Sequence, residues 1–229
     1  MNLANKVTLS RFPLTLLLLI AYFISFFIPA PALYVIPMTH ITILDLVCCV
    51  VFIIIAATDG VDGHIARSRN MVTDFGKYMD PLADKFLIDG TLIMLTAKMP
   101  WLCPTLFVVL LVGRDFIIDG LRMVCGTKGV VIPANIFGKA KTVAETVYIP
   151  FLFLRGFPFQ FIDYVFDNKN FMNWSDGTNG FWAQTMGCNG EISAMLWLDF
   201  LGIITVLLSL ISGGIYIYNA RKVLKESAK

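Results

Sequence analysis

Long apolar runs dominate the sequence, and they decide which class of fold the chain can adopt. A helix needs roughly 20 residues to cross the hydrocarbon core of a bilayer, which is about 30 Å thick. Six segments qualify, at about residues 12–28, 41–63, 75–98, 101–124, 142–158 and 194–219. Inside a bilayer only helices and closed barrels satisfy the backbone, and runs without two-residue alternation favour helices. The sequence therefore predicts an all-α, polytopic membrane protein, with residues 1–229 forming one domain and six transmembrane helices.

The composition points to lipid rather than water as the main solvent. Hydrophobic residues make up 57% of the chain and charged residues 15%, whereas a soluble domain carries roughly a quarter charged residues. The net charge of +2 says little about partners, and we expect no nucleic-acid partner. The five cysteines form no CxxC pair or Cys/His cluster, so we expect buried free thiols rather than zinc ligands or a disulfide framework. Cys188 lies alone in a polar segment, where an intermolecular disulfide is the open alternative.

The distribution of positive charge predicts the orientation. If both termini are cytoplasmic, all but three of the 18 Lys and Arg residues fall on the inner side, as the positive-inside rule requires. The exceptions are Lys98, Arg155 and Lys169. The segment "MNLANKVTLSRF" mixes apolar and polar side chains and predicts a short N-terminal interfacial helix; a frayed terminus is the alternative. A long extracytoplasmic loop is expected over about residues 156–193.

Four aspartates interrupt the second and third apolar runs near their cytoplasmic ends. Asp59 and Asp62 are three residues apart, and Asp80 and Asp84 are four apart, so each pair shares one face of its helix. Because the two helices are antiparallel neighbours, all four carboxylates can face one small volume. Such a cluster would repel itself unless a cation lay within it, and carboxylates suit Mg²⁺, Mn²⁺ or Ca²⁺. Simple ion pairs with nearby Arg or Lys would account for one or two of the acids.

These residues match a motif at every position. Asp59, Asp62, Gly63, Ala66, Arg67, Gly76, Asp80 and Asp84 fit D-x2-D-G-x2-A-R-x8-G-x3-D-x3-D. The chain thereby resembles the CDP-alcohol phosphotransferases, integral membrane enzymes of phospholipid synthesis. Residues 1–155, including "NLANKVTLSRF", "MDPLADK" and "GRDFIIDGLRMVCGTKGVVIPANIFGKAKTV", are similar to one branch, the bacterial phosphatidylglycerophosphate synthases.

The resemblance implies a role for each matching residue. Asp59, Asp62, Asp80 and Asp84 would bind two divalent ions, Mg²⁺ or Mn²⁺, and Asp84 would also act as the catalytic base. The CDP moiety would be held by the small residues and the arginine of the motif: Gly63, Ala66, Arg67 and Gly76. The implied reaction transfers the phosphatidyl group of CDP-diacylglycerol to glycerol 3-phosphate and releases CMP. A homodimer in the bacterial inner membrane, with its active site on the cytoplasmic side, is implied as well.

An anionic acceptor would need a basic pocket near the acids. Arg114 and Arg122 lie eight residues apart, roughly 80° apart around one helix, and Lys139 and Lys141 come at the start of the next. We expect these four residues to bind the acceptor phosphate, although the positive-inside rule alone would also place them there. Two further acids, Asp89 and Asp119, interrupt apolar stretches outside the motif. Asp119 is expected to pair with Arg122, or with Asp115 through a shared proton; Asp89 has no predicted role.

Other functions remain open from sequence. Within the same family the acceptor could be serine, inositol phosphate or phosphatidylglycerol. From another class, a divalent-cation transporter would also carry intramembrane acids, but its acids should give an ion access to both faces. Here all four motif acids cluster toward one side, together with Arg67.

Overall fold

The computed structural model describes residues 3–28, 41–68, 74–100, 102–127, 136–157 and 192–226. Side chains are described in these ranges except at 3–8, 59–68, 74–78, 80, 192–196 and 222–226. Every regular element of the described residues is an α-helix. The helices are α1 (Leu3–Ile24), α2 (Ile43–Ser68), α3 (Asp74–Lys98), α4 (Thr105–Thr127), α5 (Ile136–Phe153) and α9 (Ile192–Glu226). The all-α prediction is confirmed for this part of the chain.

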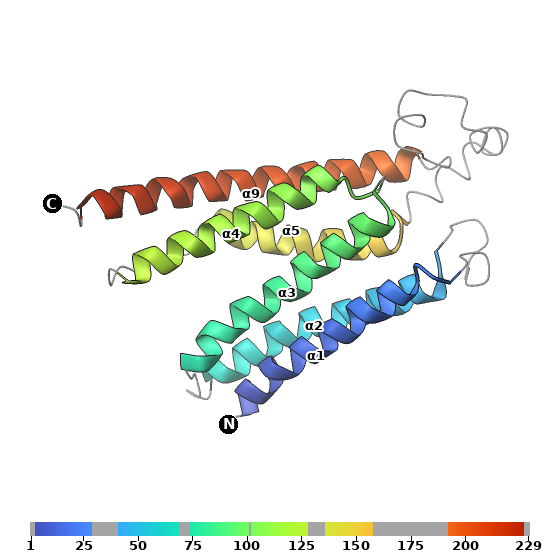
Figure 1. Cartoon of the computed structure of the whole chain (residues 1–229), viewed down its shortest axis with the longest axis horizontal. Coiled ribbons are helices and arrows are strands. Elements are labelled where there is room, and N and C mark those ends of the chain that lie inside the picture. The colour runs from blue at the N-terminus through green and yellow to red at the C-terminus, as the bar shows by residue number, and fades with distance from the viewer. Residues whose placement is uncertain are drawn as a thin grey trace.

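The helices run alternately up and down the long axis (Figure 1). One group packs α1 against both α2 and α3, and a second packs α9 against both α4 and α5. Contacts of α5 with α2 and α3, and of α3 with α4, join the groups. The start of α1 and the end of α9 therefore lie at one end, which we call the inner end; the opposite end is the outer end (Figure 1).

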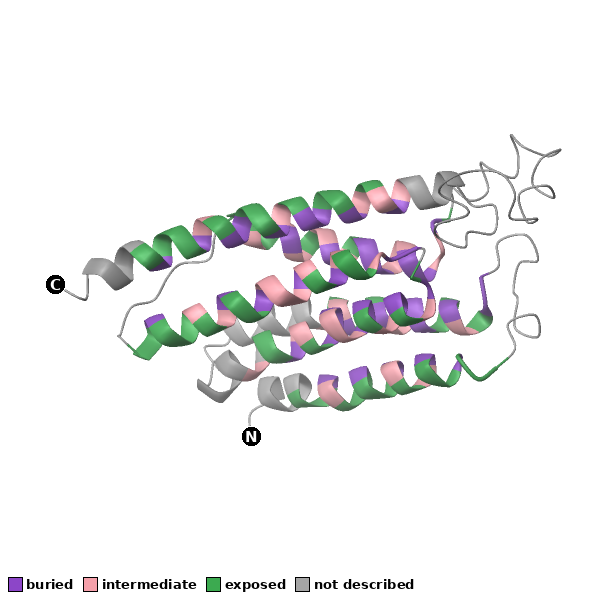
Figure 2. Ribbon diagram, turned by 45° about the horizontal axis from the view of Figure 1, so that its top comes forward, coloured by how far each residue is buried: buried purple, intermediate pink, exposed green. Residues whose placement is uncertain are grey.

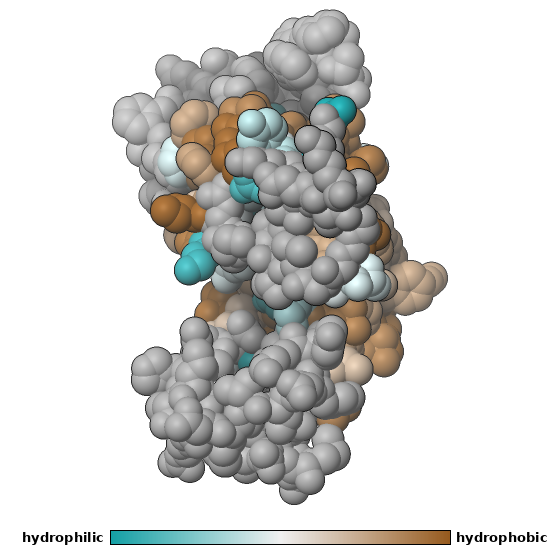
Figure 3. All heavy atoms as spheres, turned by 90° about the vertical axis from the view of Figure 1, so that its left-hand side faces the viewer, coloured by the Kyte–Doolittle hydropathy of each residue, from teal (hydrophilic) through white to brown (hydrophobic). Residues whose placement is uncertain are grey.

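The bundle has a hydrophobic core, but its outer surface differs from that of a water-soluble bundle. Large apolar side chains point outward, including Phe116 and Ile136, which are 74% and 80% exposed. Figure 2 shows exposed and buried positions alternating along the helices, and Figure 3, seen from the inner end, shows hydrophobic side chains on the flanks. Charged Asp45 and Glu145, by contrast, are only 0% and 1% exposed. An apolar exterior around buried charges suits a lipid environment.

The N-terminal segment differs from its prediction. Instead of a separate interfacial helix followed by a membrane span, residues Leu3–Ile24 form one continuous helix that includes Pro13. Proline inside a helix removes one backbone hydrogen bond and crowds the carbonyl four residues earlier, yet the helix continues through Pro13. The prediction of two elements was therefore wrong.

One segment among the described residues, Trp197–Arg221, is both long and apolar enough to cross a bilayer by itself. Two shorter apolar segments lie in α1 and α2, at Leu9–Ile24 and Ile43–Thr58. Helices α3, α4 and α5 carry charged residues toward the inner end, and some of those with described side chains, such as Asp115 and Lys141, are buried inside the bundle. Length and hydropathy therefore do not by themselves establish the predicted number of spans.

A compact ion cluster joins three helices at the outer end. Thr42 and Asp45 form a capping box at the start of α2: the Asp45 N–H donates to Thr42 Oγ1 at 3.0 Å, and the Thr42 N–H donates to Asp45 Oδ2 at 3.2 Å. Lys98, at the end of α3, lies 3.0 Å from Asp45 Oδ1, and Arg155, just after α5, lies 3.4 Å from Oδ2. We call Asp45, Lys98 and Arg155 the outer clamp.

The four cysteines in the described residues follow the prediction. Cys48, Cys49, Cys103 and Cys125 are buried and unbonded to one another. Cys188, and residues 158–191 of the predicted extracytoplasmic loop, lie outside the described residues.

Candidate active site

A cavity of about 240 Å³ opens among the inner halves of α3, α4, α5 and α9. Its lining contains the following charged residues: Lys85, Arg114, Arg122, Lys139 and Lys141 as cations, and Asp84, Asp89, Asp115 and Glu145 as carboxylates. The four cations predicted to bind an acceptor phosphate are all among them, and so is Asp84, the predicted base. Sequence placed these residues on three different helices, and the fold brings them to one cavity.

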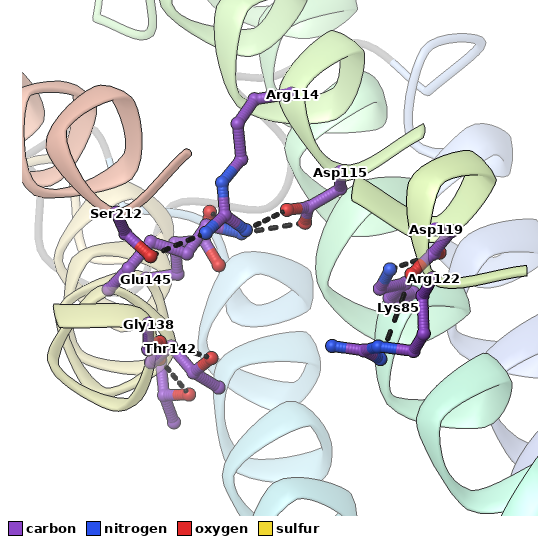
Figure 4. A network of polar contacts seen from close by, with 11 residues as sticks. Lys85, Arg114, Asp115, Asp119, Arg122, Gly138, Thr142, Glu145 and Ser212 are labelled. Carbon is purple, nitrogen blue, oxygen red and sulfur yellow. Dashed lines mark hydrogen bonds and ion pairs between the residues drawn. The ribbon is translucent and has the colours of Figure 1, made fainter. Parts of the chain in front are cut away.

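A buried network forms one wall of the cavity (Figure 4). Arg114 donates to Asp115 Oδ1 at 2.6 Å and to Ser212 Oγ at 2.7 Å. Lys141 donates to Asp115 Oδ2 at 2.6 Å and lies 2.6 Å from Glu145 Oε1. The network links α4 to α5 and α9. Because these charges are shielded from water and each has an opposite partner, the network holds the wall in place.

A second charged group lies on the α3–α4 side (Figure 4). Lys85 donates to Asp119, and Arg122 lies 3.9 Å from the same carboxylate. The predicted Asp119–Arg122 pair is therefore confirmed, whereas the alternative pairing of Asp119 with Asp115 was wrong because Asp115 is held by Arg114 and Lys141. The Arg122 side chain is 54% exposed and its guanidinium lies 5.9 Å from the Tyr216 ring centroid.

The four predicted phosphate ligands thus divide into two kinds. Arg114 and Lys141 are committed to carboxylates in the buried network. Lys139 is exposed and has no hydrogen bond or ion pair with any residue that the structure describes, and Arg122 is half exposed. Arg122 and Lys139 are consequently the cations most available to an anionic ligand.

Two glycines permit the close helix packing around this network. A Cβ atom at Gly138 would lie 3.3 Å from Ser212 Oγ, across the α5–α9 contact. A Cβ atom at Gly213 would lie 3.1 Å from Arg114 Cγ, across the α4–α9 contact. Both separations are tight, so glycine lets neighbouring helices approach and leaves room for the Arg114 side chain.

The motif residues lie at the inner end, on the last part of α2 and the first part of α3. Asp59, Asp62, Gly63, Ala66 and Arg67 belong to α2, whereas Gly76, Asp80 and Asp84 belong to α3. Helices α2 and α3 pack against each other. Of these residues only Asp84 has a described side chain, and it lines the cavity. The convergence of the other three carboxylates stays a prediction, since their side chains lie outside the described residues.

Sequence reasoning missed several residues of the cavity. Glu145 and Lys85 were not assigned roles, and neither were Ser212 and Tyr216. The i, i+4 spacing of Lys141 and Glu145 in an apolar stretch was a usable signal for their ion pair. Ser212 and Tyr216 gave no such signal, because an isolated Ser or Tyr in an apolar helix is ordinary.

The cavity combines two chemical capacities. Exposed cations can bind an anionic group, and the carboxylate of Asp84 can accept a proton from a hydroxyl group bound beside it. An open, charged cavity at the end of an apolar bundle suits a ligand that is itself anionic and polar.

Comparison with known proteins assigns the chain to a family. The sequence model of the CDP-alcohol phosphatidyltransferases matches residues 1–181. A Bacillus subtilis protein named CDP-diacylglycerol--glycerol-3-phosphate 3-phosphatidyltransferase is 38% identical over 72% of this chain and 83% of its own length. Proteins of the same name are 31% identical in Cereibacter sphaeroides, over 76% of this chain and 81% of that protein, and 43% identical in Mycoplasma pneumoniae, over 44% and 43%.

The matched region contains the whole eight-residue motif and the cavity residues of α3, α4 and α5. The chain belongs to the CDP-alcohol phosphatidyltransferase family.

Proposed function

We propose that this protein is a CDP-diacylglycerol–glycerol-3-phosphate 3-phosphatidyltransferase: it transfers the phosphatidyl group of CDP-diacylglycerol to glycerol 3-phosphate and releases CMP. The relatives that carry this name support the reaction. The observation that carries the proposal is the cavity, in which Asp84 and the available cations Arg122 and Lys139 face the same space. That arrangement suits an acceptor with a hydroxyl at one end and a phosphate at the other.

The protein would work as a six-span enzyme of the bacterial inner membrane, with both termini and the cavity on the cytoplasmic side. The apolar exterior and the shared inner position of the start of α1 and the end of α9 support this topology. The lysine and arginine distribution supports the orientation. Membrane lipid would surround the bundle, and a homodimer is the assembly that family resemblance suggests.

The metal site would be formed by Asp59, Asp62, Asp80 and Asp84. Two features support the fit: the donors are hard carboxylate oxygens, which suit Mg²⁺ or Mn²⁺, and they lie on α2 and α3, two helices that contact each other. Two divalent ions, when bound, would neutralise the diphosphate of the lipid nucleotide. The CDP moiety would lie against Gly63, Ala66, Arg67 and Gly76, where Arg67 can bind phosphate oxygens bidentately.

In the proposed reaction, Asp84 accepts the proton of the sn-1 hydroxyl of glycerol 3-phosphate. The resulting oxygen attacks the phosphorus that bears the diacylglycerol. A new P–O bond forms, the bond to the CMP phosphate breaks, and CMP leaves with the electron pair. The acyl chains stay in the bilayer throughout.

The acceptor phosphate would be bound chiefly by Arg122 and Lys139. Arg114 and Lys141, which are engaged with Asp115 and Glu145, would hold the pocket wall and add positive potential. This refines the four-residue prediction from sequence by separating ligand-binding cations from positioning ones.

One assay tests the reaction. Purified protein is incubated with CDP-diacylglycerol and, in turn, glycerol 3-phosphate, serine, inositol phosphate and phosphatidylglycerol, with and without Mg²⁺ or Mn²⁺. CMP release that needs both glycerol 3-phosphate and a divalent ion is expected. Release with another acceptor would reassign the substrate, and metal flux into proteoliposomes without CDP-lipid would indicate a transporter instead.

A further inference from the structure

Asp89 is a cavity-lining acid that the proposed mechanism does not use. It lies on α3, five residues beyond Asp84, and it lines the same cavity. Its Oδ1 atom is buried and has no hydrogen-bond partner. Throughout the described part of the chain, Asp89 takes part in no hydrogen bond or ion pair. An unpartnered carboxylate in this setting costs free energy unless a ligand satisfies it.

The neighbouring cations are already committed to other acids. Lys85, one helical turn before Asp89, pairs with Asp119, and Lys141 pairs with Asp115 and Glu145. Asp89 is therefore left facing the cavity as a hydrogen-bond acceptor without a protein donor. A phosphate would be repelled by this carboxylate, whereas a neutral hydroxyl group would be bound.

We propose that Asp89 is a specificity-determining residue that accepts a hydrogen bond from the secondary hydroxyl of the acceptor. The inference rests on the proposed function, and it deepens that function by assigning the hydroxyl that does not attack. Asp84 and Asp89 are separated by about 7.5 Å along the helix axis. They are also about 140° apart around that axis, yet both line the same cavity. The primary hydroxyl would lie at Asp84, the secondary hydroxyl at Asp89, and the phosphate toward Arg122 and Lys139.

The other carboxylates of the lining are unsuited to this role. Asp115 accepts from both Arg114 and Lys141, and Glu145 lies against Lys141. In the proposed reaction Asp84 binds the reacting hydroxyl. Of the other carboxylates in the described lining, Asp89 is the one that can accept a hydrogen bond from a second hydroxyl without breaking an ion pair.

The test compares two acceptors in the CMP-release assay: glycerol 3-phosphate and 3-hydroxypropyl phosphate, which lacks only the secondary hydroxyl. A hydrogen bond to a charged group corresponds to a factor of roughly 10–150. The native protein should therefore prefer glycerol 3-phosphate in kcat/KM by at least about 10-fold. In Asp89→Ala, kcat/KM for glycerol 3-phosphate should fall by about 10- to 100-fold. The value for 3-hydroxypropyl phosphate should change by less than about threefold, so the preference disappears.

Asp199→Ala is the matched control. Asp199 also has a buried carboxylate oxygen without a hydrogen-bond partner, but it lies near the start of α9, at the outer end (Figure 1). Its acceptor preference should equal that of the native protein. Asp89→Asn keeps the side-chain size and one acceptor oxygen, so it should retain a reduced preference, and it serves if the alanine variant fails to fold.

Two results would overturn the assignment: equal use of both acceptors by the native protein, or a parallel loss for both acceptors in the Asp89 variants. The acceptor preference of the native protein can be measured even if the Asp89 variants fail to fold. Absence of CMP release with either acceptor would instead count against the proposed function, and so the two failures are distinguishable.

Discussion

Two buried charge clusters in the described part of the chain look alike in composition but differ in structure. At the outer end, the outer clamp surrounds one carboxylate, and both oxygens of Asp45 have partners. At the inner end, the network of Arg114, Asp115, Lys141 and Glu145 borders a cavity of about 240 Å³. Beside that network, Arg122 and Lys139 extend exposed positive charge toward the same space.

The contrast separates two uses of buried charge. In the outer clamp, every charge is used to fix the ends of α2, α3 and α5 relative to one another. At the inner end the network fixes the wall, while additional charged groups stay available for ligands. Substitutions in the outer clamp should therefore change stability alone, and substitutions at the inner end should change catalysis, stability or both, according to what each side chain contacts.

The largest expected effect is the loss of the base. Asp84→Asn removes the proton acceptor, and general-base catalysis typically contributes a factor of about 10²–10⁴. CMP release should fall by about 10³-fold or more, while binding of CDP-diacylglycerol, measured at equilibrium, is retained. A variant that turns over at the native rate would remove Asp84 from this role.

The second largest effect is expected for Asp45, the carboxylate at the centre of the outer clamp. Asp45→Ala leaves Lys98 and Arg155 without their shared partner, and breaking a buried ion pair typically costs about 3–5 kcal/mol. A lower Tm in detergent is expected, with an unchanged kcat per folded molecule. Adding Lys98→Met to this variant should recover part of the Tm, because one unpaired cation is then removed. A kcat that falls with the Tm intact would break the comparison between the two ends.

Lys141 should behave as a structural residue inside the candidate active site. Lys141→Met leaves Glu145 without its ion-pair partner and removes one of the two cations that pair with Asp115. We expect the free energy of unfolding to fall by about 3 kcal/mol. The Tm should fall, and the folded fraction should keep a KM for glycerol 3-phosphate within a few-fold of the native value. Thermal unfolding followed by CMP-release kinetics on the same sample measures both quantities. A large increase in KM at native Tm would show that Lys141 binds substrate directly.

The smallest effect is expected at Lys139, two residues before Lys141. Lys139→Ala removes an exposed cation that has no ion-pair partner among the described residues, so its Tm should stay near the native value. The KM for glycerol 3-phosphate should rise by about 10-fold, the lower range for a hydrogen bond to a charged group. Arg122→Ala should behave in the same way. Equal responses at Lys139 and Lys141, in either Tm or KM, would contradict the division of the four cations.

Much of this arrangement could be predicted from the sequence. The apolar runs gave the helices, because a helix in lipid must be long and uncharged on its outer face. The regular spacing of Asp80 and Asp84 placed both on the early part of α3, and the eight-residue motif pointed to the family. The separate N-terminal helix was mispredicted, because composition could not show whether the backbone continues through Pro13.

Sequence alone therefore determined the helical class, the family and the end of the bundle at which the acids lie, since these depend on local periodicity and short fixed spacings. Tertiary structure decided which charges are available. Lys139 and Lys141 look equivalent in the sequence, yet Lys141 is buried against Asp115, 26 residues away, and Lys139 is exposed. Arg114 is held by Ser212, 98 residues away on α9. Ion pairing depends on distances between helices, and those distances are set by packing rather than by the local order of residues.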